Sequence, residues 1–247
     1  MQHLLQIDEL EKVNMTFDNY LHHIGLKTLQ RQIKAVKLNT IVKHMFSQTP
    51  TPLSEEEVKY LYVYDVPKIS EDGSCSIIDT PAEKPYNLAE IFKLSLSWNE
   101  LRTHPQTLRL WRLRNITKEV FKLTDVNWFG IYRKAQNTNN TLVLVKESYQ
   151  GLFSRPEFPL TKEFAIKSNN TTVALTGKAK VIQDVSSNNG PYYKCDGKVQ
   201  SEFCVPILDT KNSVTGIIDA ESFPKNFFTN QRLLQIAKVA YDLGQIT

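Results

Sequence analysis

The amino-acid sequence predicts an α+β fold, in which helices flank an antiparallel sheet and a helix-rich extension precedes it. Two amphipathic helices are expected, one beginning at Pro105 and the other capped by Thr229. Between them, apolar residues alternate with a period of two in short runs separated by turn residues. We therefore expect hairpins packed against helices, with residues 1–104 as the extension and residues 105–247 as the sheet domain.

The composition is that of a chain that buries a sizeable core. The 247 residues are 41% hydrophobic and 23% charged, as in ordinary globular proteins, and the net charge is only +4. The segment from Tyr20 to Phe46 nevertheless holds five Lys or Arg residues and no acid. A solvated helix face explains these charges better than a nucleic-acid surface, because no aromatic residues interleave with them. We therefore expect no nucleic-acid partner.

A helical pattern runs from about residue 4 to residue 46 and is interrupted or bent at Gly25. Its apolar residues repeat at intervals of three and four, as in Leu26, Leu29, Ile33 and Val36. Such a stripe needs a partner surface. We therefore expect this segment to pack on the sheet domain.

A break rich in Pro and Thr follows at residues 47–52. Ser54 and Glu57 have the spacing of a capping box and favour a helix up to about Tyr62, although the alternation of apolar residues also fits a strand. The rest of the extension is expected to be an irregular connector and then a short helix, at residues 67–85 and from Asn87 to about Leu96.

In the sheet domain, turn residues divide the alternating runs into strands. One longer helix is expected between the two hairpins, over residues 163–176. The expected strands cover residues 127–132, 142–146, 180–185, 201–208 and 214–220.

The sequence offers no pattern for a membrane span or a leader peptide, so we expect a cytoplasmic protein without a membrane partner. Three cysteines at wide spacing do not make a disulfide framework. No His or Cys spacing indicates a metal site, and no cofactor is expected.

Thiols and carboxylates gather in one stretch, residues 193–222, between short apolar runs. These residue types can supply a nucleophile and proton donors. Converging acids are expensive to bury without a function or a partner. The candidates are Cys195, Cys204, Glu202, Asp219 and Glu221.

Six short motifs, in order, carry a resemblance to a known family. They are Asn127-Trp-Phe-Gly-Ile-Tyr132, Tyr149-Gln-Gly151, Val181-Ile-Gln-Asp-Val185, Cys195-Asp196, Ser201-Glu-Phe-Cys-Val-Pro206 and Gly216-Ile-Ile-Asp-Ala-Glu221. Together they resemble a GAF domain of the free methionine-(R)-sulfoxide reductase family. The resemblance covers residues 106–244 and implies a GAF-like antiparallel sheet.

The resemblance also implies roles for single residues. Trp128 and Tyr132 would form an aromatic wall around the substrate. Cys195 would be the reactive thiol, and Asp196, which follows it as in the family, is a further candidate for binding the substrate. The acids that would hold the amino group and the sulfoxide oxygen are Glu202, Asp219 and Glu221.

Two cysteines of the family pattern are missing. Ala165 stands at one position, and the other falls near Arg155. Cys204 shares a strand face with Glu202, which makes it a candidate resolving thiol, while the alternative is a small buried hydrophobe.

Three functions remain open on this sequence. The chain could reduce free methionine-(R)-sulfoxide through Cys195 with an external thiol as reductant. It could instead be a catalytically degenerate GAF module that binds a small polar ligand as a sensor, or an interaction scaffold. The helices after Pro105 and Thr229 should pack side by side, and such a pair could extend into a homodimer.

Overall fold

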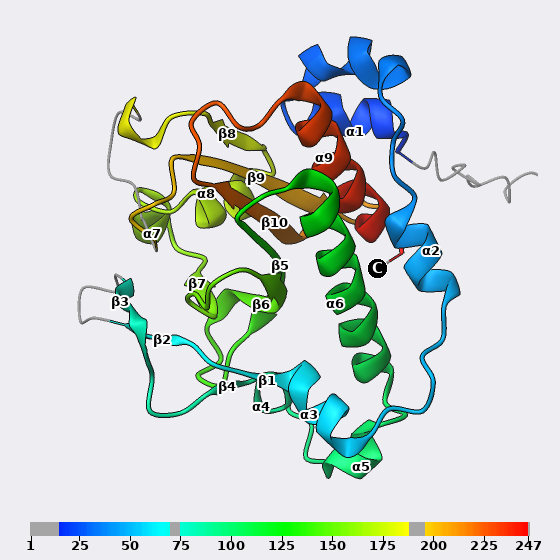
Figure 1. The fold of residues 1–247 in the computed structure, drawn as a ribbon, viewed down its shortest axis with the longest axis vertical. Helices are drawn as coiled ribbons and strands as arrows, with labels where there is room; N and C mark the ends of the chain where they lie inside the picture. The colour runs from blue at the N-terminus through cyan, green and yellow to red at the C-terminus, as the bar shows by residue number, and fades with distance from the viewer. Residues whose placement is uncertain (1–14, 70–74, 188–195, 247) are drawn as a thin grey trace, which may run out of the picture.

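The computed structural model describes residues 15–69, 75–187 and 196–246. Its centre is a six-stranded antiparallel sheet, which confirms the expected fold class (Figure 1). The order across the sheet is β7 (Glu157–Pro159), β6 (Leu142–Gln150), β5 (Trp128–Gln136), β10 (Val214–Ser222), β9 (Ser201–Leu208) and β8 (Lys180–Ile182). The four expected central strands are all present, and three of them extend beyond the expected bounds.

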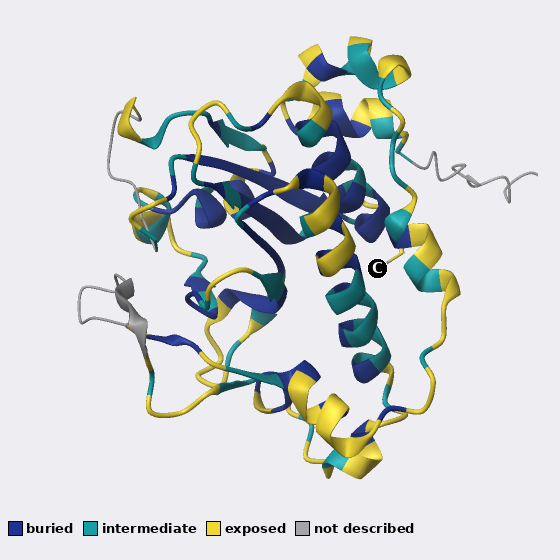
Figure 2. Cartoon of the chain, in the orientation of Figure 1, coloured by how far each residue is buried: buried dark blue, intermediate teal, exposed yellow. Residues whose placement is uncertain are grey.

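Helices α6 (Pro105–Thr124) and α9 (Asn230–Gly244) lie side by side on one face of the sheet, as expected (Figure 1). Pro105 begins α6, and the Thr229 side chain accepts a hydrogen bond from the Arg232 N–H at the start of α9. Their buried sides and the sheet form the largest apolar cluster. Figure 2 shows that burial is concentrated in the sheet and along these two helices.

The opposite face of the sheet packs against short segments. The single helix expected over residues 163–176 is wrong, because the structure has α7 (Lys162–Ala165) and α8 (Asn169–Thr176) instead. The Ser168 side chain accepts a hydrogen bond from the Thr171 N–H and so starts a new helix. The expected strand 180–185 ends at Ile182 and is followed by a 3₁₀ turn, η2 (Val185–Ser187).

The first part of the extension is not one long helix. The described residues form α1 (Phe17–His23), the 3₁₀ helix η1 (Lys27–Ala35) and α2 (Ile41–Ser47). Gly25, at φ +88°, lies in the break between α1 and η1.

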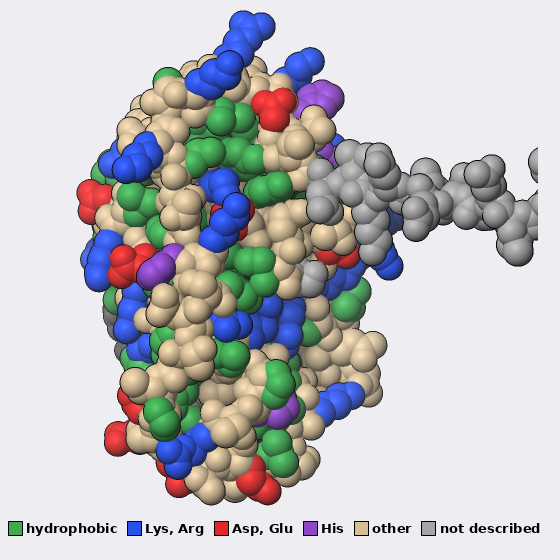
Figure 3. Space-filling model, turned by 90° about the vertical axis from the view of Figure 1, so that its right-hand side faces the viewer, with side chains coloured by type: hydrophobic (Ala, Val, Ile, Leu, Met, Phe, Trp, Pro, Cys, Tyr) green, Lys and Arg blue, Asp and Glu red, His purple; other side chains and the backbone are tan. Residues whose placement is uncertain are grey.

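These segments pack on the sheet domain, as expected. The Tyr20 hydroxyl donates to the Pro206 carbonyl at 2.6 Å, and Asn39 and Gln235 are joined by three hydrogen bonds. Helix α2 contacts both α6 and α9, so it covers part of the surface through which that helix pair could form a homodimer. Figure 3 shows this side of the molecule, where Lys and Arg are interspersed with hydrophobic and neutral side chains.

The second part of the extension packs on α6 and β6. The capping box of Ser54 and Glu57 is present and starts α3 (Glu55–Tyr62). The connector expected at 67–85 is wrong in part, since it contains two paired strands. The remaining elements are β1 (Val63–Tyr64) paired with β4 (Tyr86–Asn87), β2 (Pro67–Ile69) paired with β3 (Cys75–Pro81), α4 (Leu88–Ile91) and α5 (Trp98–Leu101).

Asn87 caps α4 as expected, but the helix ends well before Leu96. Helix α5 was not expected. None of the described helices is both long and apolar enough to cross a bilayer.

Candidate functional site

The expected site acids lie on the sheet face that is turned away from α6 and α9. In the strand register, Glu221 is opposite both Glu202 and Trp128, and Asp219 is opposite both Cys204 and Gly130. Residues opposite each other or two apart on a strand share a face. The fold therefore brings the three acids of β9 and β10 to one face of the sheet, beside Trp128 of β5.

Asp219 and Glu202 are almost fully buried, with 3% and 4% of their surface exposed. Two neighbouring amides at the start of α8 contact them. Asn170 Nδ2 donates to Asp219 Oδ2 at 3.0 Å, and Asn169 Nδ2 donates to Glu202 Oε2 at 2.8 Å. Asp219 Oδ1 is buried and has no hydrogen-bond partner among the described residues.

This environment favours the neutral form of Asp219. Burial raises its pKa well above the ordinary value of 3.8, and the nearby Glu202 raises it further. The hydrogen bonds from Asn170 and from the Ala220 backbone lower the pKa but do not reverse the shift. The two carboxyl groups thus lie close together, and ionising both is costly.

The aromatic residues of the site come from β5. The rings of Trp128 and Tyr132 are 6.3 Å apart between centroids, and the Trp128 Nε1 donates to the Leu152 carbonyl at 2.9 Å. A Cβ at Gly130 would lie 2.2 Å from the indole, and one at Gly151 would lie 2.7 Å from it. Both glycines therefore make room for the Trp128 ring beside the acid positions.

Two of the candidate residues are cysteines. Cys195 lies outside the described residues. Asp196 accepts a hydrogen bond from the Lys198 N–H at 2.8 Å, so its side chain caps its own turn. Cys204 is fully buried, and burial, followed by Asp219 and Glu202, raises the pKa of its thiol well above 9.0. A resolving role for Cys204 stays a prediction, which this burial disfavours, because the thiolate is the reactive form.

The sequence did not reveal the two amides. Asn169 and Asn170 resemble a glycosylation signal in sequence, and their contacts with the acids depend on how α8 packs. At the positions of the missing family cysteines, Arg155 and Ala165 lie close together. The Arg155 guanidinium lies 4.9 Å from the centre of the Phe164 ring, and Phe164 precedes Ala165 on α7.

Comparison with known proteins identifies the family of the sheet domain. Residues 112–246, more than half of the chain, match the GAF domain family. Over 97 residues the chain is 30% identical to the free methionine-R-sulfoxide reductase of Saccharomyces cerevisiae, which covers 39% of this chain and 49% of that protein. The match thus spans about half the length of this curated relative.

Two solved structures are similar in fold. One is a type II free methionine-R-sulfoxide reductase from Thermoplasma acidophilum, 20% identical with a TM-score of 0.46, covering 53% of this chain and 85% of that one. The other is the Neisseria meningitidis reductase in complex with its substrate, 21% identical with a TM-score of 0.46, covering 54% and 74%. The chain belongs to the GAF domain family and is a distant relative of the free methionine-R-sulfoxide reductases.

Proposed function

We propose that this GAF domain binds a small ligand that carries a protonated amine, and that an amino acid such as free methionine-(R)-sulfoxide is the ligand class. One observation carries the proposal. Asp219 and Glu202 are buried side by side under neutral amides, and Asp219 Oδ1 has no hydrogen-bond partner among the described residues. Buried acids are costly unless a cation or a proton compensates them.

An ammonium group would supply this compensation. It carries three donors and one positive charge, so it can satisfy Asp219 Oδ1 and let both carboxyl groups ionise. Trp128 and Tyr132 offer an apolar wall for the rest of the ligand. Glu221, on the same face, is the third of the acids to which the resemblance jointly assigns the amino group and the sulfoxide oxygen.

Binding should therefore release a proton wherever Asp219 is protonated in the free protein. Isothermal titration calorimetry with free methionine-(R)-sulfoxide, in two buffers of different ionisation enthalpy, measures this release. Asp219→Asn should abolish binding, because an amide of the same shape cannot become negative. Glu119→Gln is the matched control, since Glu119 is exposed on α6. Equal affinity for the wild type and Asp219→Asn would contradict the proposal.

Reduction of the bound sulfoxide through Cys195 is the second candidate. It is favoured by the resemblance at Cys195-Asp196 and by the yeast reductase as a relative. The Cys195 thiolate would attack the sulfoxide sulfur, and the oxygen would pass to the cysteine as sulfenic acid while methionine leaves. The proton for that oxygen would come from solvent, because Asp219 is ionised once the amine is bound. Two external thiols would then restore Cys195 and yield water and their own disulfide.

An external small thiol is expected because Ala165 and Arg155 occupy the positions of the family's other cysteines. Consumption of free methionine-(R)-sulfoxide should require Cys195 and glutathione, and should not be supported by thioredoxin. Thioredoxin-supported turnover that Cys204→Ser abolishes would instead assign the resolving step to Cys204. Binding without turnover would leave the ligand-binding module, and loss of both would leave the interaction scaffold.

A further inference from the structure

A cavity of about 460 Å³ lies between α6, α9 and the sheet, on the helix side. Its lining includes Arg109 of α6, Arg133 and Lys134 of β5, Thr215 of β10, and the apolar side chains Ile207 and Leu243. The acids of the proposed amine site do not line it. The cavity therefore combines positive charge with an apolar surface.

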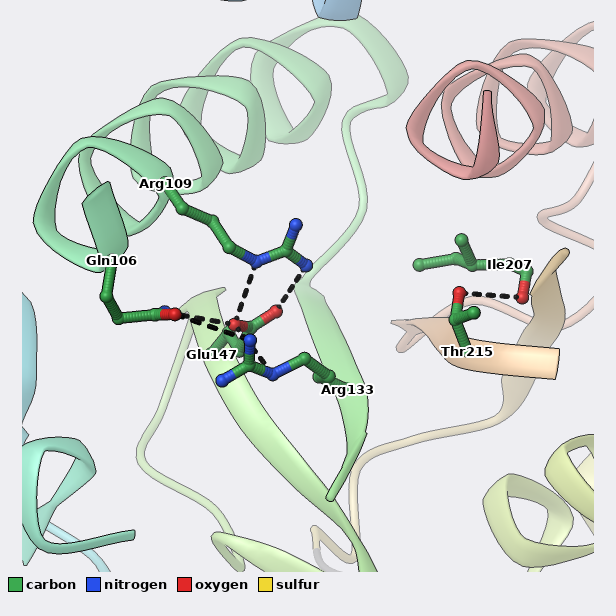
Figure 4. Close-up of polar contacts among 6 residues, drawn as sticks. All are labelled: Gln106, Arg109, Arg133, Glu147, Ile207 and Thr215. Carbon is green, nitrogen blue, oxygen red and sulfur yellow. Dashed lines mark hydrogen bonds and ion pairs between the residues drawn. The ribbon is translucent and has the colours of Figure 1, made fainter. Parts of the chain in front are cut away.

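Two of these cations share one buried carboxylate. Arg109 holds Glu147 with two hydrogen bonds, from Nε at 3.0 Å and from Nη2 at 2.8 Å, and the Arg133 Nε lies 3.3 Å from the same carboxylate (Figure 4). The Gln106 side chain bridges the cluster, since its amide faces Glu147 and its oxygen accepts from Arg133 Nη1 at 3.3 Å. Two guanidinium groups against one carboxylate leave a positive charge in surplus.

Arg133 is the less well compensated of the two. Its Nε is buried and makes no hydrogen bond among the described residues. Burial lowers the pKa of Arg133, and Glu147 offsets this only in part because Arg109 also repels the charge. The side chains of Arg109 and Arg133 keep 23% and 27% of their surface exposed. Both can therefore meet a ligand without leaving Glu147.

The cavity wall opposite the arginines is mainly apolar. Ile207 and Leu243 are buried and apolar, and Thr215 lies beside Ile207 across from the arginines (Figure 4). The Thr215 hydroxyl donates to the Ile207 carbonyl over a long 3.4 Å, so it can turn towards a ligand oxygen. Arg offers a planar fork of donors that matches a carboxylate or a phosphate.

We propose that this cavity binds a small organic anion, whose carboxylate or phosphate group faces Arg109 and Arg133 and whose apolar part faces Ile207 and Leu243. The acids of the proposed amine site lie on the other face of the sheet, while Tyr132 of β5 belongs to the lining of both sites. The anion site does not depend on the function proposed above.

The test uses phenyl phosphate and benzoate as probes of the two anion types, with phenol as the neutral control, in calorimetric titrations of the full chain. Phenyl phosphate or benzoate should bind saturably and more weakly as salt is added, while phenol should not bind. Inorganic phosphate alone should bind more weakly than phenyl phosphate, since it leaves the apolar wall empty.

Two variants of Thr215 sharpen the result without disturbing the buried cluster. Thr215→Glu should weaken anion binding by at least about tenfold, because it puts a like charge in the cavity. Thr215→Gln has almost the same shape and should change affinity by less than about threefold. Asp219→Asn should bind the probes as the wild type does.

Three results would overturn the proposal. They are no saturable binding of either anion by the wild type, equal loss of affinity in Thr215→Glu and Thr215→Gln, and binding that Asp219→Asn removes. Chemical shift changes confined to the opposite face of the sheet would also contradict it.

Discussion

The two faces of the sheet each hold a cluster of buried acid, and the two clusters differ in the groups that surround the carboxyl. Glu147, on the helix face, is compensated by two arginines, and although burial raises its pKa, Arg109 and Arg133 bring the pKa below the ordinary value of 4.5. Asp219, on the other face, has a hydrogen bond from the neutral amide of Asn170, and its pKa is raised. A buried carboxyl group thus has a lowered pKa on one face of the sheet and a raised pKa on the other.

Under the proposed function, the difference separates a structural acid, Glu147, from a ligand-binding acid, Asp219. A compensated carboxylate holds α6 to β6 and β5, so its removal should damage the fold. A buried acid such as Asp219, whose charged form is disfavoured, weakens the fold and persists only where another benefit exists, such as binding a cation. The comparison therefore predicts opposite signs for the two simplest substitutions.

The largest effect is expected for Glu147→Gln. It leaves Arg109 and Arg133 buried without their carboxylate and should lower the free energy of unfolding by about 3–5 kcal/mol. Denaturant unfolding measures this, with Glu163→Gln as the exposed control on α7. A loss below about 1 kcal/mol would place this cluster among weak surface pairs.

Asp219→Asn should act in the opposite direction. The amide imitates the protonated acid and relieves its repulsion with Glu202, so the free energy of unfolding should rise by about 1–3 kcal/mol at neutral pH. Ligand binding should be lost at the same time. A variant that is destabilised by more than about 1 kcal/mol would show that Asp219 is a structural acid, like Glu147.

The pH dependence of stability distinguishes the two clusters, because the acid-to-amide substitutions remove a charge and keep the shape of the side chain. Because the pKa of Asp219 is raised on folding, its contribution is most favourable below 3.8 and is lost as the pH rises through its folded pKa. Because the pKa of Glu147 is lowered, its contribution is present above 4.5 and is lost as the pH falls. Stability differences from Asp219→Asn and Glu147→Gln, measured from pH 3 to pH 8, should have opposite slopes. Parallel slopes would contradict the comparison.

The smallest effect is expected at Cys204, which lies opposite Asp219 on β9. Cys204→Ala should cost about 1 kcal/mol, because it removes one buried sulfur atom and leaves a small cavity. Affinity for free methionine-(R)-sulfoxide should stay within about threefold of the wild type. A larger loss of affinity, measured by calorimetry, would mean that Cys204 belongs to the site.

Much of the fold could be predicted from local patterns. The helix-start residues Pro105 and Thr229 predicted α6 and α9, and the period-two alternation of apolar residues predicted the central strands. These signals depend on residues that are close together in the sequence. Local patterns did not predict the break at Ser168, which starts a second helix within residues 163–176. They also did not predict the short helices α1 and η1, which Gly25 separates in the extension. Those breaks allow the helices to pack against the sheet, and such long-range packing cannot be predicted from a local sequence pattern.

The site was predictable in part for the same reason. The motif resemblance singled out Glu202, Asp219 and Glu221, and the strand register places them on one face. The amides Asn169 and Asn170 were missed because they reach the acids from a helix more than 30 residues earlier in the chain. The arginine pair at Glu147 was missed, because the alternation of apolar residues along a strand predicts which positions are buried but not which residues contact them.

The pKa of the Asp219 carboxyl group tests the central claim most directly. Carbon-13 NMR of aspartate carboxyl groups, assigned with Asp219→Asn, gives this pKa with and without free methionine-(R)-sulfoxide. We expect a value well above 3.8 in the free protein and a clear decrease when the ligand is bound. An ordinary value in the free protein, or a raised value that the bound ligand leaves unchanged, would contradict the account.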